Sequence, residues 1–237
     1  YLNDCVFHTA DYLIALGLLF QGLCLTNDVG RVILILNKEW TVVIMQVLKD
    51  EVQEKILQSA LTLFLKYGFE KTSIEKISKQ AHISKSNLYN YFKSKDEIFE
   101  RLTSSAANEF IKVIEQFSTN QFAPKFCEAG FEDMMVTRIF DLIDKNRNEL
   151  LLLMLGSKGT KYEHLKEQLT NQIATKFMFD YKSYFSDSDP IVTIITHNLF
   201  DGIINVTIYS QSSEELHFNL QRLIRYHVKG FSALISD

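Results

Sequence analysis

The 237-residue chain has few residues that interrupt helices, with only two prolines and nine glycines. Its three cysteines, Cys5, Cys24 and Cys127, form no CxxC pair and no Cys/His cluster. The sequence therefore predicts neither a disulfide framework nor a structural zinc site, and it favours a reducing, cytoplasmic setting. It also lacks a G-x-S-x-G elbow, a P-loop, an HExxH pair and a Gly-rich nucleotide loop. We therefore expect no enzyme, no cofactor and no metal.

Long amphipathic stretches with few breakers favour an all-α fold. The net charge is −4, but it is distributed unevenly along the chain. The segment from Met45 to Lys95 contains nine lysines and five acidic residues, which gives it +4 and leaves −8 for the rest. A basic segment on an acidic chain suits a small DNA-contacting head on a larger body. Judged by charge alone, chance clustering of the lysines is an equally good explanation.

Residues 1–44 differ from the rest of the chain. The apolar stretch Tyr12–Leu25 is too short to span a bilayer comfortably, and no basic flank precedes it. Val32–Leu36 and Thr41–Ile44 resemble strands, but we expect no sheet for them to join. Our hypothesis is that Met45 is the natural start and that an over-extended reading frame supplies the preceding residues. The alternative is a genuine extension that packs on the body or anchors to a membrane, and mass spectrometry of the native protein would distinguish the two.

Apolar residues recur at helical spacing between Val52 and Leu65, which predicts a first helix that begins near Val47 and is capped by Gly68. Thr72 and Glu75 match the S/T-x-x-E capping box and predict a second helix from about Ser73.

A tight turn at His82–Ser84 follows, and Ser84 is placed to cap a short helix that extends to Phe92. Two short helices joined by a three-residue turn form a helix-turn-helix. Ser94 and Glu97 form a second capping box, at the start of the next helix, and Ser212 and Glu215 form a third before the last helix.

The run GFEKTSIEKISKQAHISKSNLYNYFKSKDEIF, residues 68–99, resembles the DNA-binding segment of the tetracycline-repressor (TetR) family. It matches nearly every fixed position of the family pattern over about 30 residues. Two positions depart from the pattern: His82 stands where Gly is usual, and Ser78 where Ala is usual. Histidine tolerates left-handed backbone geometry better than most residues, so neither departure argues against the resemblance.

A helix fits the major groove of B-DNA, and the side chains of its first turn reach base edges. Here that turn carries Lys85, Ser86 and Asn87; lysine can donate to guanine and asparagine can pair with adenine. The resemblance implies that Tyr89 and Asn90 also meet bases or nearby backbone, and that Thr72, Tyr91 and Lys95 hold phosphates. Alternatively, Tyr89 and Tyr91 only pack between helices, and Thr72 is only a cap. The candidate DNA-binding set is Thr72, Ser73, Ser84, Lys85, Ser86, Asn87, Tyr89, Asn90, Tyr91 and Lys95.

After the head, amphipathic patterns predict a helical body. The predicted helices cover residues 96–118, 124–146, about 160–185, 191–210 and 213–235, with RNELLLLMLG following the second of them. The helix at 191–210 is apolar on nearly all sides and needs extensive cover. The last two helices resemble the family's dimerisation element, a four-helix bundle formed with a partner chain. The alternative is burial within a monomer.

The resemblance also implies a ligand cavity among the middle helices. Its candidate lining is Phe131, Met134, Met135, Met154, Phe177, Phe179 and His197, although such residues are more often ordinary core. We thus expect three parts: an atypical extension (1–44), a helix-turn-helix domain (45–95) and a ligand-binding and dimerisation domain (96–237). The expected function is a homodimeric repressor that binds a palindromic DNA operator and responds to a small apolar or amphipathic effector. The alternative is a membrane-associated sensor or a helical small-molecule-binding protein without direct gene control.

Overall fold

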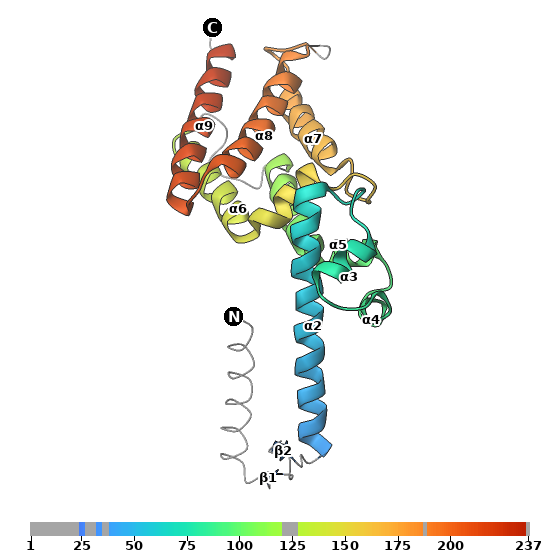
Figure 1. Cartoon of the computed structure of the whole chain (residues 1–237). Helices are drawn as coiled ribbons and strands as arrows, with labels where there is room; N and C mark the ends of the chain where they lie inside the picture. The colour runs from blue at the N-terminus through green and yellow to red at the C-terminus, as the bar shows by residue number, and fades with distance from the viewer. Residues whose placement is uncertain (1–23, 27–31, 35–37, 120–127, 187–188, 236–237) are drawn as a thin grey trace. The chain divides into compact units, whose positions relative to one another are not determined.

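The computed structural model describes residues 24–26, 32–34, 38–119, 128–186 and 189–235, with side chains from Lys49 onward. The backbone forms two compact units, Tyr1–Glu54 and Lys55–Asp237. The described elements are the strands β1 (Cys24–Thr26) and β2 (Val32–Leu34) and the helices α2 (Lys38–Tyr67), α3 (Ile74–Gln80), α4 (Lys85–Tyr89), α5 (Lys95–Ser118), α6 (Phe131–Leu155), α7 (Leu165–Asp180), α8 (Ile191–Tyr209) and α9 (Ser213–Leu234) (Figure 1). Over the described residues the fold is all-α, as predicted, apart from one short strand pair.

In the first unit, β1 and β2 pair antiparallel, with Leu25 opposite Ile33. The expectation that Val32–Leu36 has no sheet to join is therefore wrong, because Cys24–Thr26 supplies the partner strand. The prediction of a strand at Thr41–Ile44 is also wrong: these residues belong to α2, which begins at Lys38 rather than near Val47. Strand propensity is a weak prior, and extending an existing helix is easier than starting a new element. The rest of the Tyr12–Leu25 stretch lies outside the described residues.

In the second unit, the end of α2 packs against α5 through an aromatic cluster. The rings of Phe64, Phe69 and Phe99 lie with centroids 5.2–5.7 Å apart, and all three side chains are buried. The helix ends as predicted at Gly68, which has φ +78° and donates its N–H to the carbonyl of Phe64 at 2.8 Å. A left-handed residue at this position is a common helix stop, and glycine adopts it without strain.

Helices α6 to α9 form the helical body (Figure 1). The two segments predicted on either side of residue 146 are one helix, α6, which is kinked where Asn146 leaves helical geometry (φ −130°, ψ 31°). Helix α7 is shorter than predicted, beginning at Leu165 rather than near Thr160. Helices α8 and α9 lie side by side close to their predicted bounds. The predicted start of the helix over 124–146, at Pro124, lies outside the described residues.

The predicted capping box at α9 is confirmed. The N–H of Glu215 donates to Ser212 Oγ at 3.2 Å, and the Glu215 carboxylate accepts the N–H of Gln211 at 2.7 Å. The same arrangement opens α5, where the N–H of Glu97 donates to Ser94 Oγ at 3.1 Å. These contacts satisfy N–H groups that have no partner within the helix.

Helix α8 is long and apolar enough to cross a membrane, judged by length and composition alone. Its residues Val192, Thr196 and Phe200 are buried, and α8 packs against α6, α7 and α9. A core helix of a helical bundle has the same composition, so its place in the bundle accounts for its apolar character.

Candidate nucleic-acid interface and internal cavity

The helix-turn-helix is held by a small buried core and two serine caps. Ile77, Ala81 and Leu88 are fully buried between the short helices. Ser73 Oγ accepts the N–H of Lys76 at 3.3 Å, and Ser84 Oγ accepts the N–H of Asn87 at 3.1 Å. These contacts fix where α3 and α4 begin, so the first turn of α4 has a defined direction.

The turn between α3 and α4 depends on a left-handed residue. His82 has φ +55°, as its place at a usual glycine position suggested. Left-handed geometry costs roughly 1–2 kcal/mol for most L-residues, and more where the side chain is β-branched. We expect His82→Val to lower the free energy of unfolding by about 1–2 kcal/mol, whereas His82→Gly should leave it unchanged or raise it. Urea unfolding of the two variants checks this, and equal stabilities would contradict it.

The leading edge of α4 is open to solvent. The side chains of Ser84, Lys85 and Ser86 are exposed, and Asn87 is half-buried. Ser84 Oγ and Ser86 Oγ lie 3.0 Å apart, and Asn90 donates to Asn87 Oδ1 at 3.3 Å. The structure therefore brings these predicted residues together on one surface that offers both donors and acceptors.

The two tyrosines of the predicted set differ in exposure. Tyr89, which follows the buried Leu88, is 46% exposed, whereas Tyr91 is half-buried. Tyr89 is therefore open to a partner at this surface, and packing between helices describes Tyr91 better than Tyr89.

Thr72, which the resemblance assigned to phosphate binding, instead forms hydrogen bonds within the protein. Thr72 is buried and donates its hydroxyl to the carbonyls of Gly68 at 2.8 Å and Leu63 at 3.3 Å. The prediction that Thr72 caps the second helix is wrong, because Ser73 is the cap. Thr72 and Ser73 are adjacent in sequence, so the sequence pattern fits either as the cap. In the structure the Thr72 side chain is buried and the Ser73 side chain caps α3.

Lys95 is tied to the loop that precedes α3. Its Nζ donates to the carbonyls of Phe69 and Thr72, at 2.7 and 2.8 Å, and lies 3.9 Å from the centroid of the Phe69 ring. Burial lowers the pKa of this ammonium. In this structure Lys95 therefore stabilises the loop, and its assignment to phosphate binding stays a prediction.

Glu75 is a residue of this surface that sequence reasoning missed. It lies in the first turn of α3, and its carboxylate forms an ion pair with Lys85, the first residue of α4. The pairing spans ten positions in sequence and depends on the chain reversal at His82. Only the helix-turn-helix geometry could have indicated it.

The head also contacts the segment that follows α6. The N–H of Phe69 donates to the carbonyl of Gly156 at 2.9 Å, and Lys158 forms an ion pair with Glu70 at 3.2 Å. A Cβ at Gly156 would lie 2.7 Å from Leu152 Cδ1 and 3.4 Å from the carbonyl oxygen of Phe64. Glycine allows this close approach, because any side chain would have to displace the packed Leu152.

A cavity of about 140 Å³ lies between α5 and the helices of the body. Four of the predicted residues, Phe131, Met135, Met154 and Phe177, line it. The lining residues are otherwise apolar except for Arg138, Thr196, Thr207 and His227. Both threonine hydroxyls donate to carbonyls of their own helix, at 2.8 Å. The inner wall is therefore dominated by aliphatic and aromatic carbon.

Three predicted lining residues lie elsewhere. Phe179 is 71% exposed. It lies two residues after Phe177, which lines the cavity, and two residues along an α-helix bring a side chain to nearly the opposite face. Met134 packs on the cluster around Val136 and Ile224. His197 is half-buried on α8 next to the lining residue Thr196 but does not line the cavity itself.

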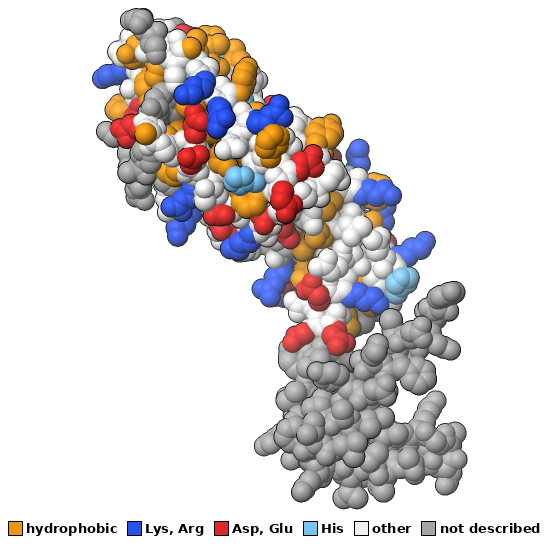
Figure 2. Space-filling view, turned by 90° about the vertical axis from the view of Figure 1, so that its left-hand side faces the viewer, with side chains coloured by type: hydrophobic (Ala, Val, Ile, Leu, Met, Phe, Trp, Pro, Cys, Tyr) orange, Lys and Arg blue, Asp and Glu red, His pale blue; other side chains and the backbone are white. Residues whose placement is uncertain are grey.

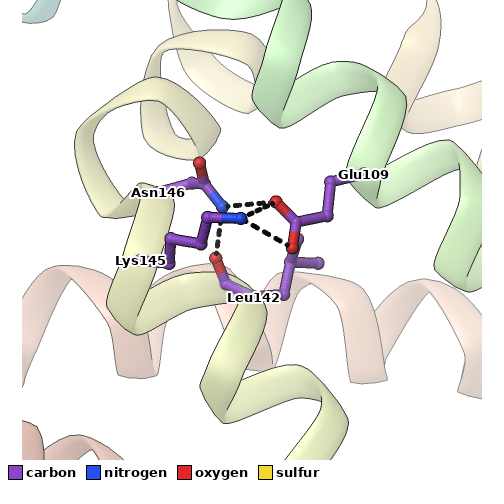
Figure 3. Close-up of polar contacts among 4 residues, drawn as sticks. All are labelled: Glu109, Leu142, Lys145 and Asn146. Carbon is purple, nitrogen blue, oxygen red and sulfur yellow. Dashed lines mark hydrogen bonds and ion pairs between the residues drawn. The ribbon is translucent and has the colours of Figure 1, made fainter.

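Polar contacts join the kink of α6 to α5 (Figure 3). Glu109 on α5 accepts from Lys145 Nζ at 3.0 Å and from Asn146 Nδ2 at 3.1 Å, and Asn146 Nδ2 also donates to the carbonyl of Leu142 at 3.2 Å. The Lys145 ammonium is the main cause that lowers the pKa of Glu109. The next residue, Arg147, donates to the carbonyls of Thr207 and Ser210 at the end of α8. The kink thus links three helices that also line the cavity.

The outer faces of α8 and α9 carry exposed apolar side chains. Ile194 and Ile208 on α8 are 49% and 41% exposed, and Phe218 and Tyr226 on α9 are 55% and 73% exposed. Figure 2 shows hydrophobic side chains between charged ones on the face that it draws. Among the described residues, no group of three or more His, Cys, Asp or Glu side chains is placed to hold a metal ion.

A helix-turn-helix with an exposed second helix, followed by a helical body, defines a nucleic-acid-binding class of protein. Residues 56–102 match the family model of bacterial regulatory proteins, tetR family. The biofilm operon icaADBC negative transcriptional regulator IcaR of Staphylococcus aureus is 38% identical over 143 residues, which is 58% of this chain and 75% of IcaR. The chain therefore belongs to the TetR family of regulators.

Two further comparisons agree. IcaR of Staphylococcus epidermidis is 35% identical over 117 residues, and this match spans 49% of the chain and 60% of the length of that relative. The crystal structure of SCO3833, a TetR family member from Streptomyces coelicolor, aligns over 74% of this chain and 90% of its own, with a TM-score of 0.53 and 21% identity. The structural match supports the fold alone.

Proposed function

We propose that the protein is a dimeric repressor whose α4 enters the major groove of operator DNA. The observation that supports this most directly is the exposed first turn of α4, Lys85 to Asn87, on a capped and packed frame. Lysine and asparagine side chains there can donate to guanine and pair with adenine. Repression, rather than activation, is suggested by the function of the relative IcaR as a negative regulator. Selection of duplexes from a random library tests the proposal, and failure to enrich any sequence would reject it.

Dimerisation through α8 and α9 would cover their exposed apolar side chains. Ile194 and Ile208 are fourteen residues apart and therefore lie within about 40° of each other around the helix axis. A symmetric partner would bury this face and that of α9, and it would set two copies of α4 about 34–36 Å apart for successive major grooves.

We expect Tyr226→Glu to convert the dimer to a monomer, because an unpaired charge would be buried at the interface. The matched control is Phe179→Glu on α7, since Phe179 is equally exposed, at 71%. Light scattering after size exclusion gives the mass of each variant. A Tyr226→Glu protein that stays dimeric, or a monomeric wild type, would contradict this interface.

The effector that fits the cavity is a small, largely apolar molecule that carries no positive charge. None of the described residues that line the cavity is Asp or Glu, so a bound cation would have no counter-charge. An apolar cavity of about 150 Å³ in another protein stays dry and binds benzene. We expect benzene to raise the melting temperature of this protein by binding the native state. Benzylammonium, a cation built on the same ring, should have no effect; a larger shift with the cation would contradict the assignment.

The contacts around the cavity offer two connections to the head. The last turns of α6 line the cavity through Leu150, Leu151 and Met154. Gly156 follows directly, and its carbonyl accepts a hydrogen bond from the N–H of Phe69. Glu109 ties the kink of α6 to α5, whose first residue is Lys95 in the head. A ligand that binds two arrangements of these helices unequally would shift the distance between the two copies of α4.

A further inference from the structure

Two opposite charges meet on the surface that we assign to DNA. Glu75 from α3 accepts a hydrogen bond from the Nζ of Lys85, the first residue of α4. Both side chains are largely exposed, at 60% for Glu75 and 50% for Lys85. The pair is therefore accessible to a partner.

The carboxylate stands among positive charges. Glu75 is the one acidic residue between Lys71 and Lys95, a stretch that contains six lysines. A negative charge beside DNA phosphates weakens binding to any sequence, since phosphate attraction supplies most non-specific affinity. The position of Glu75 thus has a cost in affinity that a neutral residue would avoid.

The ion pair gives Glu75 a use that offsets this cost. A lysine side chain has a flexible four-carbon stem, and ordering it on binding loses conformational entropy. The contact with Glu75 already restricts the stem of Lys85 at the first turn of α4. An ammonium has three N–H donors, so it can keep one on the carboxylate and direct the others to a base.

We propose that Glu75 is a positioning residue for DNA specificity: it orients the Lys85 ammonium toward a base and, by its negative charge, weakens binding to DNA that lacks the matching base. This inference rests on the proposed DNA-binding function. The Lys85 contact also lowers the pKa of Glu75 to about 2, so the carboxylate is ionised at any physiological pH.

The test compares two duplexes of equal length and composition: one selected from a random library by the full-length protein, and one with its sequence shuffled. Affinities are measured by fluorescence anisotropy for the wild type, Glu75→Gln, Lys85→Ala and the double variant. Glu115→Gln, an exposed acid near the far end of α5, controls for the loss of one negative charge. Glutamine keeps the shape of Glu75, and circular dichroism checks that each variant is folded.

We expect Glu75→Gln to strengthen binding to the shuffled duplex by about threefold, the effect of one unit charge several ångströms from phosphate in water. The ratio of selected to shuffled affinity should fall by about threefold or more. In the Lys85→Ala background, Glu75→Gln should strengthen both duplexes alike and leave the ratio unchanged, and Glu115→Gln should alter neither.

The inference is overturned if Glu75→Gln shifts both duplexes equally in the wild-type background, leaves both unchanged, or lowers the ratio equally when Lys85 is absent. A different outcome rejects the proposed function itself: the wild type enriches no sequence, or binds selected and shuffled duplexes equally well.

Discussion

Replacing both Lys85 and Asn87 by alanine should abolish most of the discrimination between operator and unrelated DNA. Each base-contacting side chain contributes about 1–3 kcal/mol of selective binding. The double substitution should therefore lower operator affinity by roughly 30-fold or more. Both residues belong to the first turn of α4, and the buried Leu88 beside them holds that turn in place. Unrelated duplex should be affected much less, because it lacks the base contacts.

Filter binding or anisotropy with selected and shuffled duplexes measures both effects. Lys112→Ala is the matched control, since Lys112 is an exposed lysine on α5 outside the head. Lys95→Ala should weaken both duplexes to a similar degree if Lys95 reaches phosphate on binding. Unchanged operator affinity for the Lys85/Asn87 variant would show that α4 does not read the bases.

A single methyl group at Gly156 should destabilise the protein at the junction of head and body. The added Cβ would meet Leu152 Cδ1 at 2.7 Å and two backbone carbonyl oxygens at 3.3 and 3.4 Å. Leu152 is 1% exposed and cannot move without disturbing its packed neighbours. We expect Gly156→Ala to lower the free energy of unfolding by about 1–3 kcal/mol.

Gly230→Ala is the control with the opposite expected sign. Gly230 lies within α9, and nothing lies within 4 Å of the position that a Cβ would take. Alanine in a helix interior is more stable than glycine by roughly 0.5–1 kcal/mol, so this variant should gain stability. Urea unfolding of both variants gives the comparison. A Gly156→Ala protein as stable as wild type would mean that the junction is loosely packed.

Local sequence rules predicted much of the head and the start of the last helix. Hydrophobic spacing located the helices, and Ser84, Ser94 and Ser212 cap α4, α5 and α9 as expected from their sequence neighbours. The left-handed geometry of His82 also follows from a local pattern. These features depend on residues within a few positions of each other, which a sequence pattern represents directly.

The features that sequence reasoning missed depend on contacts between distant residues. Thr72 turns inward because carbonyls as far back as Leu63 accept its hydroxyl. The kink at Asn146 involves Glu109, 37 residues away, and Arg147 reaches the end of α8 about 60 residues later. The cavity likewise joins side chains from several helices, so periodicity selected Phe179 as readily as Phe177. Only tertiary packing distinguishes such alternatives.

Methylation interference on the selected duplex distinguishes major-groove from minor-groove binding, because dimethyl sulfate modifies guanine N7 in the major groove and adenine N3 in the minor groove. If the exposed turn of α4 reads base edges, methylated guanine N7 should block binding at two clusters about one helical turn apart. The Lys85→Ala variant should lose interference at one guanine in each cluster. Interference confined to adenine N3, or none at guanine, would contradict the assignment of α4 to the major groove.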